Sequence, residues 1–197
     1  RWYRDAWRRS HNGGPIVIDE EGAATARNAG LAMPSHVHIT RNVNANGIIT
    51  SGNYFSYRAV FKKNVGDYTF RGAVSAQYAY QATGGNVFPE PFIFWERDDY
   101  PLQAGDELEL YRTVQQSAPD LLGDRHQLAL THVITSAEIA AGVIVIDDTC
   151  TDDALGAFLY FNSAQEGAAL NNFVPPPSVD IATFKGAAFY NAPTLFH

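Results

Sequence analysis

A chain of 197 residues, 46% of them hydrophobic and 13% aromatic, can bury one substantial core, which excludes a wholly disordered protein. Residues 1–10 carry four arginines against one aspartate, so the net charge of −7 leaves −10 on residues 11–197. A body of that sign repels phosphate groups, and nucleic acid is therefore not expected as the main partner. No apolar run approaches the roughly 18 residues that cross a bilayer, and the single cysteine excludes an intrachain disulfide.

The first ten residues, RWYRDAWRRS, interleave arginines with large aromatic side chains. Read as a helix, the stretch places Trp2, Tyr3 and Trp7 along one side, although ten residues are too few to hold a helix alone. Trp, Tyr and Arg dominate the binding energy of protein interfaces. We therefore predict a docking segment over residues 1–14 that binds another protein subunit. Its contact residues are Trp2, Tyr3, Arg4, Trp7, Arg8 and Arg9. Stacking of single-stranded bases on these aromatics is the alternative.

Alternation of apolar and polar residues with period two is the strongest pattern along the chain. It is longest at 67–80, DYTFRGAVSAQYAY, which predicts one half-buried strand with Gly72 as a bulge. Further strands are predicted at 15–19, 36–41, 54–62, 91–97, 106–114, 126–135, 142–147 and 157–162. Turn-forming residues separate these runs, without alternating helices. The spacing predicts an all-β domain, an antiparallel β-sandwich of the jelly-roll kind.

Few segments have a helical pattern, and a proline-rich stretch follows the last predicted strand. Short helices are predicted at 20–30, 136–142 and 163–172. The second of them would begin with Ser136 as its N-cap and end at Gly142. The prolines of VPPPSV, 174–179, cannot donate hydrogen bonds to a sheet, so they indicate an extended segment that crosses the domain outside its central strands. The predicted organisation is a docking segment at 1–14, a β-sandwich domain at 15–173 and an extended C-terminal tail at 174–197. The tail would pack on the domain or on a neighbour.

Two histidines, His36 and His38, stand in one predicted strand and are separated by a single residue. Their side chains should point to the same face of that strand, about 6–7 Å apart. Neutral imidazoles in this arrangement can bind one divalent metal ion if a third ligand converges on it. Two exposed histidines at the edge of a strand are the alternative. The pair is the metal-ligating candidate of the chain.

The same residues carry a resemblance to a known family. Gly30, His36 and His38 have the spacing of the first cupin motif, and residues 101–105, PLQAG, resemble the start of the second. The motif's glutamate would fall at position 42 or 43, which are asparagine and valine. The resemblance implies a metal-dependent oxygenase with the metal on the two histidines. The H-x-H spacing is also similar to iron-binding motifs at the trimeric tips of phage tail fibres and spikes.

The other titratable residues have structural and functional interpretations side by side. His126 and His132 lie on an apolar face of a predicted strand, where a hydrogen-bonded core or interface histidine is expected. The acidic run DDTCTDD, 147–153, provides oxygen ligands for Ca²⁺ or forms an acid-rich helical turn. Carboxylates at 96–99 and 105–109 suit acid–base hydrolysis of sugars or a solvated hairpin end. No nucleophile elbow, phosphate loop or dinucleotide motif is present, so an enzyme is not predicted.

A surplus of aromatic residues on the predicted strands is the main pointer to function, because a sandwich needs only one apolar face per strand. The residues concerned are Tyr54, Phe55, Tyr57, Tyr68, Tyr78, Tyr80, Trp95, Tyr100 and Tyr111. Exposed members would stack on sugar rings or anchor a protein interface.

With these aromatics, aromatic-bearing segments at both ends that suit contacts with neighbours, and no catalytic motif, the chain resembles the structural β-sandwich proteins of virus and phage particles. The resemblance implies a capsid, decoration or tail component, located in the virion, that forms a homo-oligomer or a larger assembly with other protein subunits. One alternative is a glycan-binding module of a fibre or an extracellular protein. The other is a cupin-like metalloenzyme that uses His36 and His38.

Overall fold

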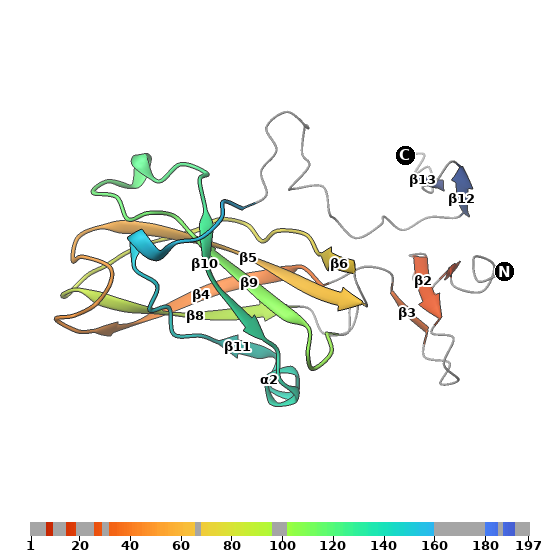
Figure 1. Ribbon diagram of the computed structural model, residues 1–197, viewed down its shortest axis with the longest axis horizontal. Coiled ribbons are helices and arrows are strands. Elements are labelled where there is room, and N and C mark those ends of the chain that lie inside the picture. The colour runs from red at the N-terminus through yellow and green to blue at the C-terminus, as the bar shows by residue number, and fades with distance from the viewer. Residues whose placement is uncertain are drawn as a thin grey trace, which may run out of the picture.

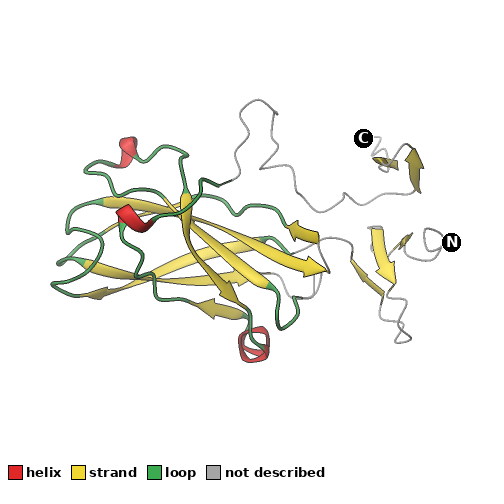
Figure 2. Cartoon of the chain, viewed as in Figure 1, coloured by secondary structure: helices red, strands yellow, loops and turns green. Residues whose placement is uncertain are grey.

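The computed structural model describes residues 7–9, 15–18, 26–28, 32–65, 68–95, 102–159, 180–184 and 187–191 (Figure 1). Its strands are β1 Trp7–Arg9, β2 Pro15–Ile18, β3 Ala26–Asn28, β4 Pro34–Val43, β5 Tyr54–Val65, β6 Tyr68–Arg71, β7 Tyr78–Gln81, β8 Val87–Trp95, β9 Glu107–Arg112, β10 Gln127–Val133, β11 Val143–Val145, β12 Asp180–Phe184 and β13 Ala187–Asn191. Its helical elements are the 3-10 turns η1 Pro119–Leu121 and η2 Asp152–Ala154 and the helix α2 Ser136–Ala141. Figure 2 shows the helical turns at the surface of a body made of strands. The described part is mostly β, as the alternation predicts.

The larger sheet has the strand order β10-β9-β5-β6, and β7 pairs with β5 as well. All of these pairs are antiparallel. The central strand β5 is 12 residues long, with β9 along one side and β6 and β7 along the other. Successive residues of a strand point to opposite faces, so Phe55, Tyr57, Ala59 and Phe61 share one face of β5. All four point into the core and are buried.

The smaller sheet has the order β11-β8-β4 and is also antiparallel. Buried residues of both sheets belong to one hydrophobic cluster, in which Val37, Ile93 and Ile144 of the smaller sheet meet Phe61 and others of the larger one. The rings of Phe61 and Trp95 pack edge to face across this core, with their centroids 5.8 Å apart. Apolar burial between the two sheets therefore stabilises the body.

The stretch expected as one strand over 67–80 is divided into β6 and β7, which pair with different parts of β5. Between them, the Gly72 N–H donates to the Phe61 carbonyl and the Ser75 N–H donates to the Ala59 carbonyl. The Ala59 N–H in turn donates to the Ser75 hydroxyl at 2.9 Å instead of to a backbone carbonyl. The prediction of one regular strand is wrong because a serine side chain replaces part of the backbone ladder. Gly72 itself keeps the register of β6 with β5, and the irregular pairing lies between Gly72 and Tyr78, so the bulge predicted at Gly72 is displaced.

Two segments near the N-terminus have strand rather than helical conformation. Trp7–Arg9 and Ala26–Asn28 pair with the two sides of β2. The helical interpretations of 1–10 and 20–30 are therefore wrong at these residues, because pairing with β2 satisfies their backbone groups. In the stretch expected as an extended tail, β12 and β13 pair with each other as an antiparallel hairpin. The predicted helix at 163–172 lies outside the described residues.

Helix α2 confirms a predicted helix and corrects its N-cap from Ser136 to Thr135. The Thr135 side chain accepts the Glu138 N–H at 3.3 Å, and the Glu138 carboxylate accepts the Thr135 N–H at 2.7 Å. This reciprocal arrangement is a capping box. Gly142 ends the helix at φ 75°, a left-handed conformation that glycine adopts without steric cost.

A Thr135→Ala variant is expected to lose about 1 kcal/mol of the free energy of unfolding, because the first turn of α2 loses its cap. The matched control is Ser136→Ala, which removes a neighbouring hydroxyl outside the capping box and should change stability by less than about 0.5 kcal/mol. Urea denaturation of both variants measures the difference. Equal losses in the two variants would contradict the assignment of Thr135 as the cap.

Candidate functional site

The outer face of the β11-β8-β4 sheet carries two rows of apolar and imidazole side chains. Strand pairing aligns these six outward residues across the sheet, and we call them the aromatic–histidine face: Val143, Phe94, His36, Val145, Phe92 and His38. Phe94 is 36% exposed, Val145 is 41% exposed, and both histidines are exposed. A sheet face turned to water is normally polar, so this composition departs from that of a solvated face.

The rings of this face contact one another. The imidazoles of His36 and His38 stack with their centroids 6.4 Å apart and their planes inclined by 23°. His36 also lies 6.2 Å from Phe94, and His38 lies 6.3 Å from Phe92. Tyr78, from the other sheet, packs edge-on against His36 at 5.2 Å. The prediction that the two histidines share one face of a strand is confirmed.

A metal ion at His36 and His38 would need a third ligand from elsewhere. Among the residues that the structure describes, no group of three or more His, Cys, Asp or Glu side chains is placed to hold a metal ion. Glu90 accepts a hydrogen bond from the Thr40 hydroxyl at 2.5 Å, so its carboxylate already has a partner. The metal site at the two histidines stays a prediction.

A second cluster lies inside the body, where Arg112 of β9 faces the segment that follows β11. Arg112 is fully buried, and its Nε lies 2.9 Å from Asp148 Oδ2 in an ionic contact that lacks the alignment of a hydrogen bond. Its Nη1 pairs with Asp152 at 2.7 Å, and its Nη2 donates to the Cys150 carbonyl. Tyr57 donates a hydrogen bond to Asp148, whose other oxygen accepts the Cys150 N–H at 2.9 Å. One arginine thus ties the segment after β11 to the larger sheet.

Burial dominates the titration of this cluster. Burial, followed by the charge of Asp148, raises the pKa of the Tyr57 hydroxyl well above its ordinary value, so Tyr57 remains a donor. Burial also disfavours the charged form of Arg112, but Tyr57, Asp148 and Asp152 outweigh it and raise the pKa of the guanidinium. Burial and then Asp148 raise the pKa of the Cys150 thiol, which keeps the sulfur protonated and weakly nucleophilic.

The acidic run at 147–153 therefore has a structural use. Asp148 and Asp152 form ion pairs with the buried Arg112. Two of the carboxylates proposed as calcium ligands are therefore already paired with a guanidinium. The acid-rich turn is confirmed as η2, although no side chain caps it. Sequence reasoning missed Arg112, yet a signal was present. The residue follows Leu110 by two positions and so lies on the apolar side of the alternation, where an inward arginine needs a buried partner.

On the outer side of the larger sheet, His126 is buried against Ser56. The Ser56 Oγ lies 3.0 Å from His126 Nε2, and His126 Nδ1 lies 3.1 Å from the Asp124 carbonyl oxygen. A carbonyl only accepts, so Nδ1 carries the hydrogen and Nε2 accepts from the Ser56 hydroxyl. Ser56 is 0% and His126 is 1% exposed, so the pair fastens a loop to the sheet and does not meet a substrate.

The expected hydrogen-bonded core histidine is confirmed at His126. Burial, and to a lesser extent the charge of Arg58, lowers the pKa of His126 from 6.5 to about 4, so its imidazole is neutral at physiological pH. His132 is partly exposed and lies 2.8 Å from the Glu138 carboxylate. The two histidines, which the alternation placed on one face, therefore have different surroundings. A register shift between Leu128 and Leu130 in β10 separates them.

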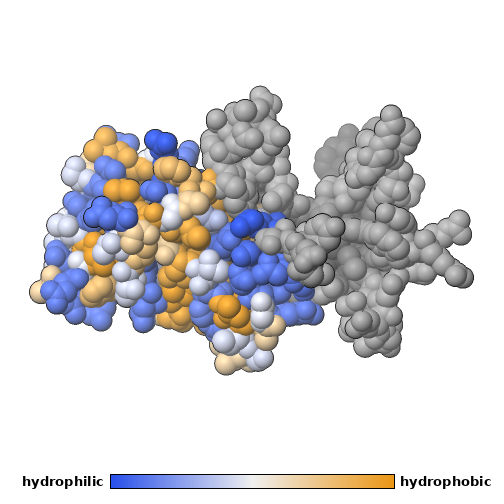
Figure 3. Space-filling view, in the orientation of Figure 1, coloured by the Kyte–Doolittle hydropathy of each residue, from blue (hydrophilic) through white to orange (hydrophobic). Residues whose placement is uncertain are grey.

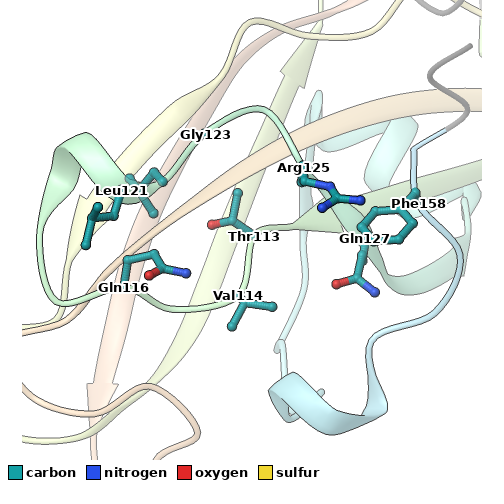
Figure 4. Close-up of a pocket in the computed structure, with 9 residues that line it drawn as sticks. Thr113, Val114, Gln116, Leu121, Gly123, Arg125, Gln127 and Phe158 are labelled. Carbon is teal, nitrogen blue, oxygen red and sulfur yellow. The ribbon is translucent and has the colours of Figure 1, made fainter. Parts of the chain in front are cut away.

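A pocket of about 290 Å³ lies between the end of β9, the loop that carries η1 and Phe158. Figure 4 shows Arg125, Gln127 and Phe158 together on one side of it and Leu121 on the other. The Arg125 guanidinium lies 5.0 Å above the centre of the Phe158 ring. Phe158 is 52% exposed and Leu121 is 56% exposed. Sequence reasoning missed this site. Of the strand predicted at 157–162, the described residues 157–159 make an isolated bridge between Phe158 and Gln127, and residues 160–162 lie outside the described structure.

The residues predicted to dock a partner are only partly within the described structure. Trp2, Tyr3 and Arg4 lie outside it, and for Trp7–Arg9 it describes the backbone of β1. Their docking role stays a prediction. Of the aromatics singled out in the sequence, the buried ones are Phe55, Tyr57, Trp95 and Tyr111, and the half-buried ones are Tyr54, Tyr78 and Tyr80; the side chains of Tyr68 and Tyr100 lie outside the description. The aromatics that the structure does expose, Phe94 and Phe158, were not among them.

No protein-family model, curated protein or solved structure matches the chain. Among the described residues, no helix has the length and apolar composition needed to pass through a membrane. The functional conclusion therefore depends on the geometry of the sites themselves.

Proposed function

We propose that the protein is a structural subunit that associates with further copies of itself through the aromatic–histidine face. The observation that carries the proposal is the exposure of Phe94 on the central strand β8 and of Val145 on the neighbouring strand β11 of one sheet face. The centres of protein interfaces are enriched in aromatic residues and depleted in charged ones. Contiguous apolar surface on a soluble protein marks such interfaces more often than it is left to water.

The distribution of charge allows a second copy of the chain to be the partner at this face. The net charge of −7 opposes the close approach of two copies over most of the surface. The two rows of the face contain no carboxylate and no ammonium group, and the nearby Glu90 and Asp147 lie beyond them along the strands. Two identical faces can therefore stack without repulsion between like charges. A two-fold arrangement would match the same patch on both subunits.

The architecture supports the same proposal. We propose that the two sheets form a β-sandwich, because they contribute to one hydrophobic core and leave their outer faces available for contacts. A capsid, decoration or tail component of a virus or phage particle would use such faces to build the particle. The jelly-roll connectivity and the virion location stay predictions.

A Val145→Lys variant is expected to convert the oligomeric chain into monomers, because each copy would bring a charge into the desolvated apolar interface. The matched control is Val133→Lys, a substitution of the 58% exposed strand valine in the larger sheet, which should leave the oligomer intact. Size-exclusion chromatography with light scattering, over a range of concentrations, measures the mass of each species.

Three results would overturn the proposal. The parent chain could be monomeric at every concentration, or Val133→Lys could dissociate the oligomer as completely as Val145→Lys does. In the third, removal of residues 1–10 would produce monomers while Val145→Lys remains oligomeric. That result would place the interface at the predicted docking segment instead of at the sheet face.

A further inference from the structure

We infer that the pocket beside Phe158 binds a single acidic sugar unit, a pyranose ring that carries a carboxylate. The inference is independent of the proposed self-association, because no residue of the aromatic–histidine face lines this pocket. A volume of about 290 Å³ is just below the usual range for small-molecule sites, roughly 300–1,000 Å³, which suits one ring better than a longer chain.

Arg125 provides the site for the carboxylate. In the part of the chain that the structure describes, no carboxylate lies within ion-pair distance of its guanidinium, although the protein has 21 acidic residues and 14 basic ones. Stacking on Phe158 holds the guanidinium at the rim of the pocket and leaves its in-plane N–H groups available. A carboxylate can accept two parallel hydrogen bonds from such a fork.

Neutral hydrogen-bonding groups surround the rest of the pocket and suit sugar hydroxyls. Thr113 lines the pocket and is 2% exposed; its hydroxyl accepts the Ser56 N–H at 3.0 Å and lies 3.4 Å from the Ser56 hydroxyl oxygen, a long contact from which its own hydrogen can turn to a ligand. Gln127 uses its amide N–H on the Gly156 carbonyl at 3.2 Å, which leaves its oxygen as an acceptor. The Gln116 side chain has no hydrogen-bond partner among the described residues. Hydroxyl groups both donate and accept, so they can satisfy all three side chains.

The walls are apolar and suit the C–H faces of a sugar ring. Val114, Leu121 and Phe158 line the pocket and are 39%, 56% and 52% exposed. In Figure 3, hydrophobic residues appear at the surface of the end of the body where the η1 loop projects. An aromatic edge with aliphatic neighbours can pack against a pyranose ring while the polar groups bind its hydroxyls. A hydrocarbon carboxylate would leave those polar groups unpaired.

The experiment is isothermal titration calorimetry with methyl β-D-glucuronide and with methyl β-D-glucoside, the same ring without the carboxylate. The parent chain should bind the glucuronide about tenfold more tightly, because the charge-assisted contact with Arg125 is lost with the glucoside. Arg125→Gln should abolish that preference. The control Arg41→Gln removes the same charge at an exposed position outside the pocket and should preserve the preference.

A second variant tests the sugar itself. Gln116→Met removes a carboxamide without changing the charge and should weaken both glycosides several-fold. Thermal melts establish that each variant is folded. The inference is overturned if the parent chain binds neither glycoside, or if Arg125→Gln keeps the preference for the acid. It is also overturned if cyclohexanecarboxylate binds as tightly as the glucuronide, because the pocket would then recognise a plain carboxylate.

Discussion

An Arg112→Leu variant is expected to lose about 3–5 kcal/mol of the free energy of unfolding and to melt roughly 10 °C below the parent protein. The substitution leaves Asp148 fully buried opposite an apolar side chain, without the cation that now lies 2.9 Å away. It also removes the ion pair with Asp152 and the hydrogen bond to the Cys150 carbonyl. Urea denaturation followed by tryptophan fluorescence measures the loss.

Two further variants decide whether the loss arises from the unpaired charge. Arg41→Leu makes the same chemical change at an exposed position and should alter stability by less than about 0.5 kcal/mol. The double variant Arg112→Leu/Asp148→Leu should be more stable than Arg112→Leu alone, because both members of the buried pair are gone. If the double variant is as unstable as the two single losses added together, the pair does not act as a unit.

Acidification from pH 6.5 to pH 4 is expected to remove about 3 kcal/mol of stability through His126 alone. Its pKa is lowered to about 4 in the folded chain and is about 6.5 when unfolded. Between these values the unfolded state binds a proton that the folded state does not, so stability falls as the pH falls. Well above pH 6.5 and well below pH 4 the two states bind the same number of protons at this residue, and its contribution is constant.

The measurement is the free energy of unfolding in urea at several pH values, in the parent chain and in His126→Gln. The variant side chain does not titrate in this range, so its stability should depend less steeply on pH between 4 and 6.5. His132→Gln, at the partly exposed histidine of the same strand region, is the control and should retain the steeper dependence. Identical slopes in the parent chain and His126→Gln would show that His126 is not held neutral by burial.

Strand positions could be predicted from alternation because it depends only on which side of a strand faces the core. The segment around His36 and His38 is a clear case, since both side chains point outward as expected. Alternation does not report whether the backbone ladder is intact. The irregular pairing around Ser75 depends on a hydroxyl that meets Ala59, which lies on another strand. The alternation of apolar and polar residues therefore could not predict that contact.

The polar clusters were harder to predict, because their members come from distant parts of the chain. Arg112 meets Asp148 only because the end of β9 faces the segment after β11 across the core. The contact between His126 and Ser56 likewise joins two segments far apart in the sequence. The exposure of Phe94 depends on which face of β8 turns outward. Its neighbour Ile93 points inward and is fully buried. Because β8 has apolar residues on both faces, its sequence does not indicate which face is the buried one.

Two tyrosines have a consequence for how copies of this chain can meet. Tyr78 and Tyr80 donate hydrogen bonds to the Ser35 and Val37 carbonyls of β4, at 3.0 Å and 2.7 Å. These carbonyls lie on the border strand of the smaller sheet, where unsatisfied backbone groups would act as a template for strand addition by another chain. Because the hydroxyls already occupy these acceptors, growth of a continuous sheet from one copy into the next is disfavoured along this border. If copies of this chain associate as proposed, contacts between sheet faces are therefore favoured over strand addition at the β4 border.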